Sequence, residues 1–289
     1  MLIDKVHKLP VWDRLLYWIR EREAIRLRRE GGKPRPWTDD AILRQYRFCN
    51  VRRMDDKVSR WLLEKWYTPN KGSPNMFLAC VIARHFNLPT TLAVLGFPKL
   101  WQPEKVRASC KLLKEKGWNV FNNAYIISGG TGAKPNGPRR DKIDIVIDKV
   151  IQPIIDSGYT PDTNSMQQSV EGMLGFAGIG SFMAGQIIAD MRWAAPGRWL
   201  DKCDWAPQGP GSTRGLCRLY EMDVDRHGLK ADDFLQGLRE VIAYCKRRLP
   251  PGISERLEAI DYQSCLCEYD KFSRAIEGDG KPKQKYAGV

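Results

Sequence analysis

A glycine turn between two helical stretches places the strongest constraint on how this chain can fold. Gly178 and Gly180 flank Ile179 in this turn. The apolar residues that follow recur at helical spacing, at Ala184, Ile187, Ile188 and Met191. Because two of the three turn positions lack a side chain, backbone N–H groups can approach a phosphate closely, with the positive end of the second helix behind them. The pattern predicts a helix-hairpin-helix, which holds a nucleic-acid backbone without reading its sequence. The alternative is an ordinary helix–helix turn inside an all-α core.

Two aspartates follow the hairpin, after a break at Pro196 and Gly197. Asp201 lies 21 positions after Gly180 (201 − 180), and Asp204 follows it closely. This stretch resembles the helix-hairpin-helix DNA glycosylases, in which a glycine- and proline-containing loop leads to a catalytic aspartate at about this distance. The resemblance makes Asp204 and Asp201 the candidate catalytic residues. Glycosylases that also cut the strand carry a lysine just after the hairpin, where this chain has 181–183 as Ser-Phe-Met, so Schiff-base chemistry from that place is not expected.

The charge balance indicates a polyanionic partner. The 289 residues include 47 basic and 34 acidic ones, which gives a net charge of +13. Charge alone does not separate nucleic acid from an acidic membrane surface. No apolar run approaches the roughly 20 residues of a membrane span, and the N-terminal residues lack the apolar core of a signal peptide. We therefore expect a cytoplasmic protein that does not bind a membrane.

The cysteines do not indicate a metal site. The sequence has eight cysteines with no C-x-x-C pair, and three histidines. A structural zinc site is therefore not expected, and reduced thiols are the default for a cytosolic protein.

The apolar periodicity predicts a mainly α protein with very little strand. Residues 11–30 form one strong amphipathic pattern, with alternating arginine and glutamate on the polar side. Further helices are expected over 75–97, 103–117, 141–156, 165–174, 231–249 and 253–276. We expect an N-terminal helical part over 1–160, a hairpin-containing catalytic part over 161–276 packed on it, and a disordered tail over 277–289.

Two further stretches combine charge with unusual composition. Three arginines and two aspartates lie within the ten positions 47–56, at Arg47, Arg52, Arg53, Asp55 and Asp56. This density indicates either a buried ion-pair network that fixes helix packing or a surface that handles phosphate.

The second stretch is GPGSTRGL over 209–216. Its small residues would let a nucleic-acid backbone or base come close. Ser212 and Thr213 could donate hydrogen bonds to phosphate, and Arg214 supplies charge. A structural turn that leads into a helix is the alternative.

Three stretches carry a wider resemblance: WTDDAILRQYRFCNVRRMDDKVSRWL, WAPQGPGSTRGL over Trp205–Leu216, and DYQSCLCEYDKFSR over Asp261–Arg274. They resemble the helical domain of phage 5-hydroxymethyl-deoxyuridine DNA kinases. The same domain occurs in the related amino acid:DNA transferases, also described as α-glutamyl/putrescinyl-thymine pyrophosphorylases. The glycine-rich stretch around Gly132 does not match the G-x-x-x-x-G-K-[ST] phosphate-binding motif, because Gly132 is followed by Ala-Lys-Pro. The chain is therefore not expected to be the kinase itself.

The resemblance implies a step in the hypermodification of thymidine in phage DNA. A separate kinase phosphorylates 5-hydroxymethyluracil in double-stranded DNA, and the transferase displaces the phosphate or pyrophosphate with the amine of a free amino acid, of which glycine is the simplest. Mg²⁺ could assist the leaving group, and no other cofactor is expected. The implied partners are modified DNA, the amino acid and the kinase, in the host cytoplasm. A helix-hairpin-helix glycosylase for a modified base, or a non-catalytic DNA-binding partner of the kinase, are the alternatives.

The candidate residues divide into four roles. Asp204 and Asp201 are the candidate bases that deprotonate the amine. The leaving group is expected to bind at Arg52, Arg53, Arg214 and Lys271. DNA contacts are expected at Gly178, Gly180, Ser181, Ser212 and Thr213. The ammonium group of the amino acid is expected at Glu268 or Asp270.

Overall fold

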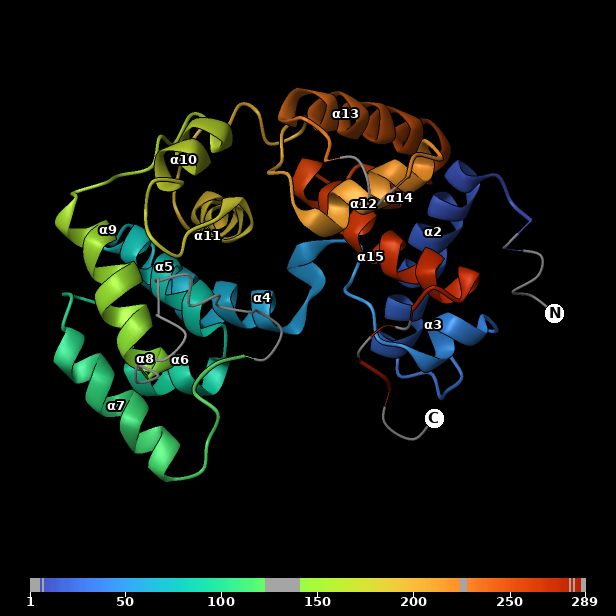
Figure 1. Cartoon of the computed structure of the whole chain (residues 1–289). Coiled ribbons are helices and arrows are strands. Elements are labelled where there is room, and N and C mark those ends of the chain that lie inside the picture. The colour runs from blue at the N-terminus through green and yellow to red at the C-terminus, as the bar shows by residue number, and fades with distance from the viewer. Residues whose placement is uncertain are drawn as a thin grey trace, which may run out of the picture. The chain divides into compact units, whose positions relative to one another are not determined.

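The protein is mainly helical, as the sequence predicts (Figure 1). The computed structural model describes residues 6, 8–122, 141–223, 228–280, 282 and 284–286. Within these ranges the β pairing is an isolated antiparallel bridge between Tyr46 and Lys285. No helix in the described part of the chain is long and apolar enough to cross a membrane. The stretch around Gly132, where the phosphate-binding motif is not matched, lies outside the described residues.

The chain divides into two compact units, Met1–Asp56 with Lys202–Val289, and Lys57–Asp201. This division differs from the expected boundary after residue 160, which falls between two helices of the second unit.

The N-terminal helix buries its apolar face against helices from the far end of the chain. The Tyr17 ring stacks on Phe272 at 6.4 Å between centroids, and the Tyr269 hydroxyl donates a hydrogen bond to the Val11 carbonyl.

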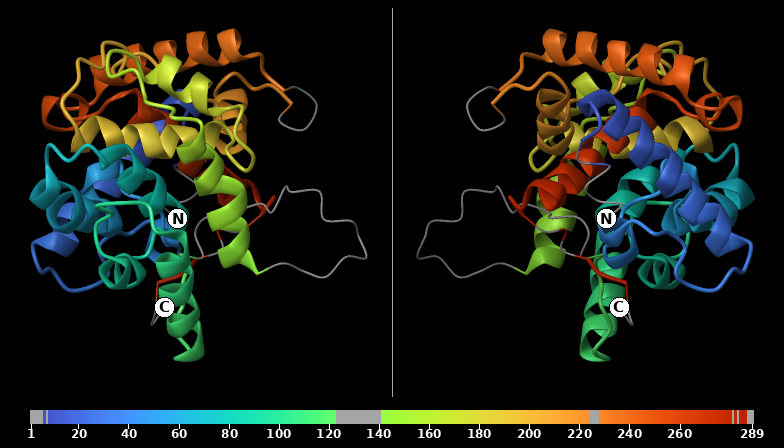
Figure 2. Two further views of the ribbon diagram at one scale, coloured as in Figure 1. Left: turned by 90° about the vertical axis from the view of Figure 1, so that its left-hand side faces the viewer. Right: turned by 90° about the vertical axis from the view of Figure 1, so that its right-hand side faces the viewer.

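The first unit is built from helices of both chain ends. They are α2 (Val11–Glu30), α3 (Ala41–Gln45), the 3-10 turn η1 (Arg53–Asp55), α12 (Pro210–Leu219), α13 (Ala231–Arg248), α14 (Pro251–Ser254) and α15 (Ala259–Glu277). The amphipathic pattern over residues 11–30 forms α2, and its apolar face, including Leu15, Trp18 and Ile19, is fully buried. α13, drawn in orange, can be followed from two further sides in Figure 2.

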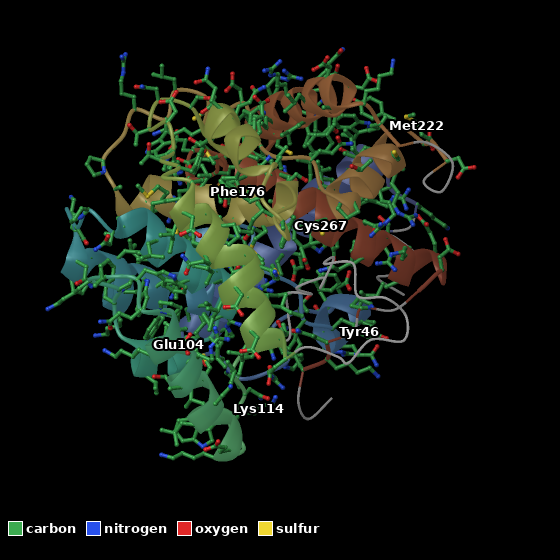
Figure 3. All side chains as sticks on the ribbon, turned by 60° about the vertical axis from the view of Figure 1, so that its left-hand side comes forward. Tyr46, Glu104, Lys114, Phe176, Met222 and Cys267 are labelled. Carbon is green, nitrogen blue, oxygen red and sulfur yellow. The ribbon has the colours of Figure 1, made fainter. Side chains whose placement is uncertain are left out.

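Two glycines let α12 and α15 cross at short range. A Cβ atom at Gly215 would overlap the carbonyl oxygen of Leu266, and one at Gly211 would overlap the sulfur of Cys267. Cys267 is labelled on α15 in Figure 3. The glycine-rich stretch therefore leads into a helix, and its glycines serve the close approach of two backbones.

The second unit contains the hairpin. Its helices are α4 (Lys57–Trp61), η2 (Leu62–Tyr67), η3 (Thr68–Asn70), α5 (Met76–Phe86), α6 (Pro89–Leu95), α7 (Pro103–Glu115), α8 (Lys142–Ile145), η4 (Val146–Ile151), α9 (Gln152–Asp156), α10 (Met166–Met173) and α11 (Ser181–Ala194). η2 and η4 are turns of π-helix that continue α4 and α8.

A buried ion pair joins α5 to α11 in this unit. Arg84 Nε donates to the Asp190 carboxylate at 2.5 Å, and the Tyr67 hydroxyl donates to the same carboxylate at 2.6 Å. Arg84 is 2% exposed and Asp190 is 0% exposed. Because both charges lie in the interior, they must satisfy one another, and the pair fixes how α5 and α11 pack.

Residues 284–286, within the stretch expected to be a disordered tail, are bonded to the segment around α3. Tyr286 N donates to Gln45 O at 3.1 Å, and Arg47 N donates to Gln284 O at 2.9 Å. The Tyr286 ring packs edge-on against Trp37 at 5.8 Å. These backbone bonds and the buried ring hold 284–286 against the first unit.

We expect His85 to make the stability of the second unit depend on pH. The imidazole is 2% exposed, Nδ1 lies 2.7 Å from Val81 O, and burial lowers the pKa of His85 from its ordinary 6.5 to about 4. As the pH falls below 6.5, His85 therefore becomes protonated in the unfolded chain while it stays neutral in the folded chain. The free energy of unfolding is therefore highest above pH 6.5 and falls by about 3 kcal/mol as the pH approaches 4.

Urea unfolding at pH 7 and pH 4.5 measures this loss. The His85→Leu variant, which carries no titrating group at this position, should lose correspondingly less stability over the same interval. Equal losses in the two proteins would contradict the prediction.

Candidate functional site

The hairpin forms as a helix, a short turn and a helix, with its glycines at the surface. Gly178 and Gly180 are exposed, whereas Ile179 between them is 5% exposed and anchors the turn. Gly178 has φ +77°, which favours glycine, and a Cβ there would lie 2.9 Å from Val150 Cγ2. Phe176, labelled in Figure 3, packs on Tyr159 at 5.9 Å. The exposed turn is compatible with the predicted phosphate contact by Gly178, Gly180 and Ser181.

Asp201 caps the first helix of the hairpin. Its carboxylate accepts hydrogen bonds from Met166 N at 2.8 Å, Gln167 N at 2.9 Å and the Ser165 hydroxyl at 2.8 Å. These bonds satisfy N–H groups that the first turn of α10 cannot pair internally. Asp201, which belongs to the second unit, therefore has a structural role as a helix cap in addition to its predicted catalytic role.

Asp204 is differently placed. It is exposed, and its carboxylate has no hydrogen bond or ion pair among the described residues. Its segment meets the first turn of α15, because Ala259 N donates to Lys202 O at 3.1 Å.

The first turn of α15 also receives the arginine segment. Asp261, 3% exposed, accepts from Arg53 N at 2.8 Å and from Glu258 N at 3.0 Å. The structure therefore brings the backbone of Arg53 and the segment before Asp204 to the same helix end. Sequence reasoning missed Asp261 as the residue that binds the Arg53 backbone, although it lies in one of the family-like stretches.

The mixed-charge block contains an ion-pair network. The Asp55 carboxylate lies 3.3 Å from Arg26 Nε, 3.2 Å from Arg256 and 3.9 Å from Arg52. Asp55 is 8% exposed, so the network fixes the packing of α2 against η1, as the structural interpretation predicts. The Arg52 side chain remains 38% exposed, which leaves it accessible to a phosphate.

A second polar cluster surrounds Cys49. Glu268, buried on α15, accepts from Cys49 N at 3.2 Å and from Lys271 Nζ at 2.5 Å. The negative charge of Glu268 raises the pKa of the Cys49 thiol well above its ordinary value. Burial also raises the pKa of Asp56, against a hydrogen bond from Asn50 N and the charge of Arg53. Glu268 is thus paired by Lys271, and the Lys271 side chain is 38% exposed.

Asp270 organises a third set of charges. Its carboxylate accepts from Arg214 Nε at 3.1 Å and from Arg218 Nε at 2.9 Å, and lies 3.4 Å from Arg274 Nε. Asp270 is 0% exposed, so it positions these arginines. The Arg214 side chain is 40% exposed and lies at the surface as a phosphate ligand requires.

The two hydroxyls of α12 have local partners. Ser212, 1% exposed, donates to Gly209 O at 3.0 Å and accepts from Gln263 Nε2 at 3.1 Å. Thr213 donates to Gly209 O at 2.9 Å and accepts from Gln208 Nε2 at 3.2 Å. These bonds stabilise the first turn of α12, and the DNA contact of both hydroxyls stays a prediction.

The sequence matches the helical domain of 5-hmdU DNA kinase over residues 9–281. The chain belongs to this family. A curated relative, the 5-hmdU DNA kinase of Bacillus phage SP10, is 27% identical over 233 residues, which are 73% of this chain and 36% of that protein. The chain therefore corresponds to little more than a third of that kinase. No solved structure matches. All the candidate residues of the helical domain named above lie inside the matched range.

Proposed function

We propose that this chain modifies thymine in phage DNA by transferring an amino acid onto phosphorylated or pyrophosphorylated 5-hydroxymethyluracil. The observation that carries the proposal is the family match, which covers residues 9–281 and so nearly the whole chain. The relative's name assigns it 5-hmdU in DNA as the substrate. A shared helical domain supports a shared DNA substrate, with a different chemical step performed here.

The step exchanges one bond for another at the exocyclic methylene carbon of the base. Asp204 removes a proton from the ammonium group, and the free amine attacks the methylene carbon. The C–O bond breaks, and phosphate or pyrophosphate leaves with the electron pair. The exposed side chains of Arg52, Arg214 and Lys271, together with Arg53, neutralise the leaving group. The exposure of Asp204, compared with the capping bonds of Asp201, favours Asp204 as the base.

DNA binding in this proposal depends on charge and on the hairpin. A net charge of +13 attracts the phosphate backbone without regard to sequence. The exposed turn at Gly178 and Gly180 supplies a close backbone contact at the beginning of α11. Extrusion of the base from the duplex would give the exocyclic carbon access to the side chains.

The transfer is tested by mass spectrometry of nucleosides. Duplex DNA containing 5-hydroxymethyluracil is treated with a 5-hmdU DNA kinase, ATP, this protein and a pool of amino acids. We expect a new nucleoside heavier by one amino acid residue, and its mass names the donor. Release of free base would show a glycosylase, and unchanged kinase product would show a non-catalytic role; either result contradicts the proposal.

The Gly180→Asp variant separates DNA binding from folding. Gly180 is the N-cap of α11 and has no side-chain cap, and a Cβ there meets nothing within 4 Å. Aspartate is a better N-cap than glycine by a few tenths of a kcal/mol, so stability should be kept or rise. Its negative charge at the phosphate contact should weaken duplex binding by about tenfold, the effect of about 1.4 kcal/mol.

A fluorescence anisotropy titration with duplex DNA measures this effect. Gly252→Asp adds the same charge on α14, where a Cβ also meets nothing within 4 Å. Equal affinities for the Gly180→Asp and Gly252→Asp variants would exclude the hairpin as a DNA contact.

A further inference from the structure

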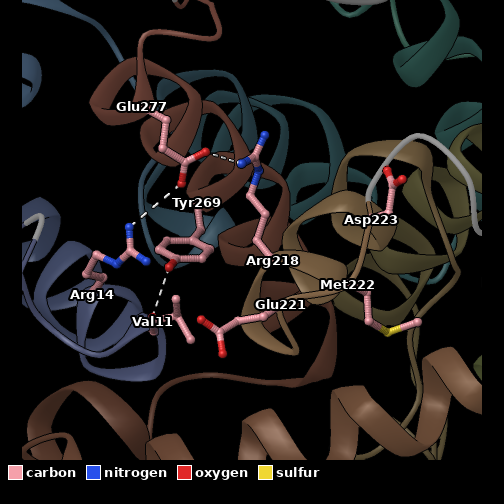
Figure 4. A pocket seen from close by; sticks show the side chains of 8 residues that line it. All are labelled: Val11, Arg14, Arg218, Glu221, Met222, Asp223, Tyr269 and Glu277. Carbon is pink, nitrogen blue, oxygen red and sulfur yellow. Dashed lines mark hydrogen bonds and ion pairs between the residues drawn. The ribbon is translucent and has the colours of Figure 1, made fainter.

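A cavity of about 320 Å³ in the first unit lies between α2, α12 and α15 (Figure 4). Charges of both signs line it: the guanidinium groups of Arg14 and Arg218, and carboxylates that include those of Glu221 and Glu277. The Tyr269 ring lies between the side chains of Arg14 and Arg218. This volume is at the small end of ligand sites, so the cavity suits a small molecule that carries both a positive and a negative group.

The guanidinium of Arg14 keeps capacity to bind an anion. Its Nη1 lies 3.7 Å from Glu277, and its side chain is 12% exposed. Its Nε is buried and has no hydrogen-bond partner among the described residues. Arg218, by contrast, is held by Asp270 at 2.9 Å and by Glu277 at 2.5 Å. Of the two guanidinium groups, Arg14 is thus the less tightly paired, with one carboxylate contact at 3.7 Å against the two shorter contacts of Arg218, and it is the one free to bind a ligand carboxylate through its terminal nitrogens.

Glu221 has a left-handed backbone conformation, which is unusual for a residue with a side chain. Its φ is +53°, directly after α12, and Met222 N donates back to Cys217 O at 2.9 Å. Helices that end in this way usually place glycine at the left-handed position, because a side chain there costs conformational energy. The Glu221 carboxylate lines the cavity and has no hydrogen bond or ion pair among the described residues. Glu221 is exposed, and a left-handed residue whose unpaired carboxylate lines a cavity is a candidate ligand contact.

We propose that this cavity binds a small α-amino acid as its zwitterion, with the carboxylate at Arg14 and the ammonium group at Glu221. The inference rests on the proposed function, since an amino acid transferase needs a donor site. Arg214 and Arg218 lie one turn apart on α12, and both bind Asp270. The donor site is therefore next to an arginine assigned to the leaving group. Glu221 takes the ammonium-binding role for which the sequence had indicated Glu268 or Asp270, both of which are already paired.

Binding is tested by calorimetric titration of the full chain with glycine and then with each of the other standard amino acids. We expect saturable binding of at least one of them, and roughly tenfold or weaker binding of acetate and methylamine, which each lack one charge. The Glu221→Gly variant should fold at least as well, because glycine suits φ +53°, and should bind the amino acid roughly tenfold more weakly. Arg14→Gln should have a similar effect.

The Glu255→Gln variant, which changes an exposed carboxylate of the same unit outside the cavity, is the matched control and should bind as the wild type does. Absence of binding for all amino acids, or unchanged affinity in the Glu221→Gly variant, would overturn the assignment. If binding depends on Glu221 but no modified nucleoside forms, the site stands and the proposed function fails. If the nucleoside forms with an unchanged KM for the amino acid in the Glu221→Gly variant, the function stands and the site fails.

Discussion

Asp204→Asn is expected to lower the rate of amino acid transfer by a factor of about 10²–10⁴, the usual contribution of a general base. The asparagine side chain has the same shape but cannot take the ammonium proton. Because Asp204 is exposed and its carboxylate is bonded to none of the described residues, the substitution should leave the unfolding midpoint unchanged. Single-turnover rates with kinase-treated DNA measure the effect, and a parallel titration should show unchanged DNA affinity.

Asp201→Asn is the matched comparison for the neighbouring aspartate. Its carboxylate accepts three hydrogen bonds at the beginning of α10, so the substitution should cost about 1 kcal/mol of stability through the weakened cap. Its transfer rate should stay close to that of the wild type. If the rate falls for Asp201→Asn and not for Asp204→Asn, the roles assigned to the two aspartates are wrong.

Gly215→Ala is expected to cost the first unit about 3 kcal/mol of stability, at the upper end for overpacking. The added Cβ would overlap the Leu266 carbonyl oxygen and lie 2.7 Å from its carbon. Both belong to the backbone of α15, which cannot rotate away as a side chain can. The helices would therefore have to separate. Separation would disturb a packed region of α15, because Leu266 is fully buried and Tyr269 is 1% exposed.

Urea unfolding followed by circular dichroism measures this loss. Gly252→Ala is the matched control, because a Cβ at that position meets nothing within 4 Å. A difference of less than about 0.5 kcal/mol, the usual range for surface changes, between Gly215→Ala and the control would show that the two helices do not cross as closely as the structure has them.

Local sequence signals predicted the helices well. The amphipathic pattern over 11–30 forms α2 (Val11–Glu30), and Pro103 begins α7 as a proline at a helix start should. Helices also flank the glycine turn on both sides, as the periodicity predicts, with Gly178 and Gly180 at the surface. These features depend on residues a few positions apart, whose periodicity and caps are visible in the sequence itself.

What the sequence could not predict depends on residues that are far apart along the chain. The first unit joins residues 1–56 with 202–289, and no local pattern indicates that pairing. The capping role of Asp201 at Met166 and the pairing of Arg84 with Asp190 likewise appear only when the helices are packed. The cavity is a further example, because Arg14 and Glu221, which are far apart along the chain, both line it.

The structure shows which of the predicted site residues are exposed and which are buried. Arg52, Arg214 and Lys271 lie at the surface of one unit, as leaving-group ligands require. Asp270 is buried and holds arginines, because a carboxylate beside several guanidinium groups is satisfied by them before any ligand arrives. Residue type and spacing therefore indicated which charged groups to consider, whereas packing decides which of them face solvent; their chemical roles stay predictions.

The most direct measurement follows the nitrogen of the donor. DNA containing phosphorylated 5-hydroxymethyluracil is incubated with this protein and ¹⁵N-labelled amino acid, and its nucleosides are analysed by mass spectrometry. The account predicts a nucleoside that carries the labelled nitrogen on its exocyclic carbon, with one phosphate or pyrophosphate released for each one formed. DNA free of ¹⁵N, with the base either unchanged or released, would contradict it.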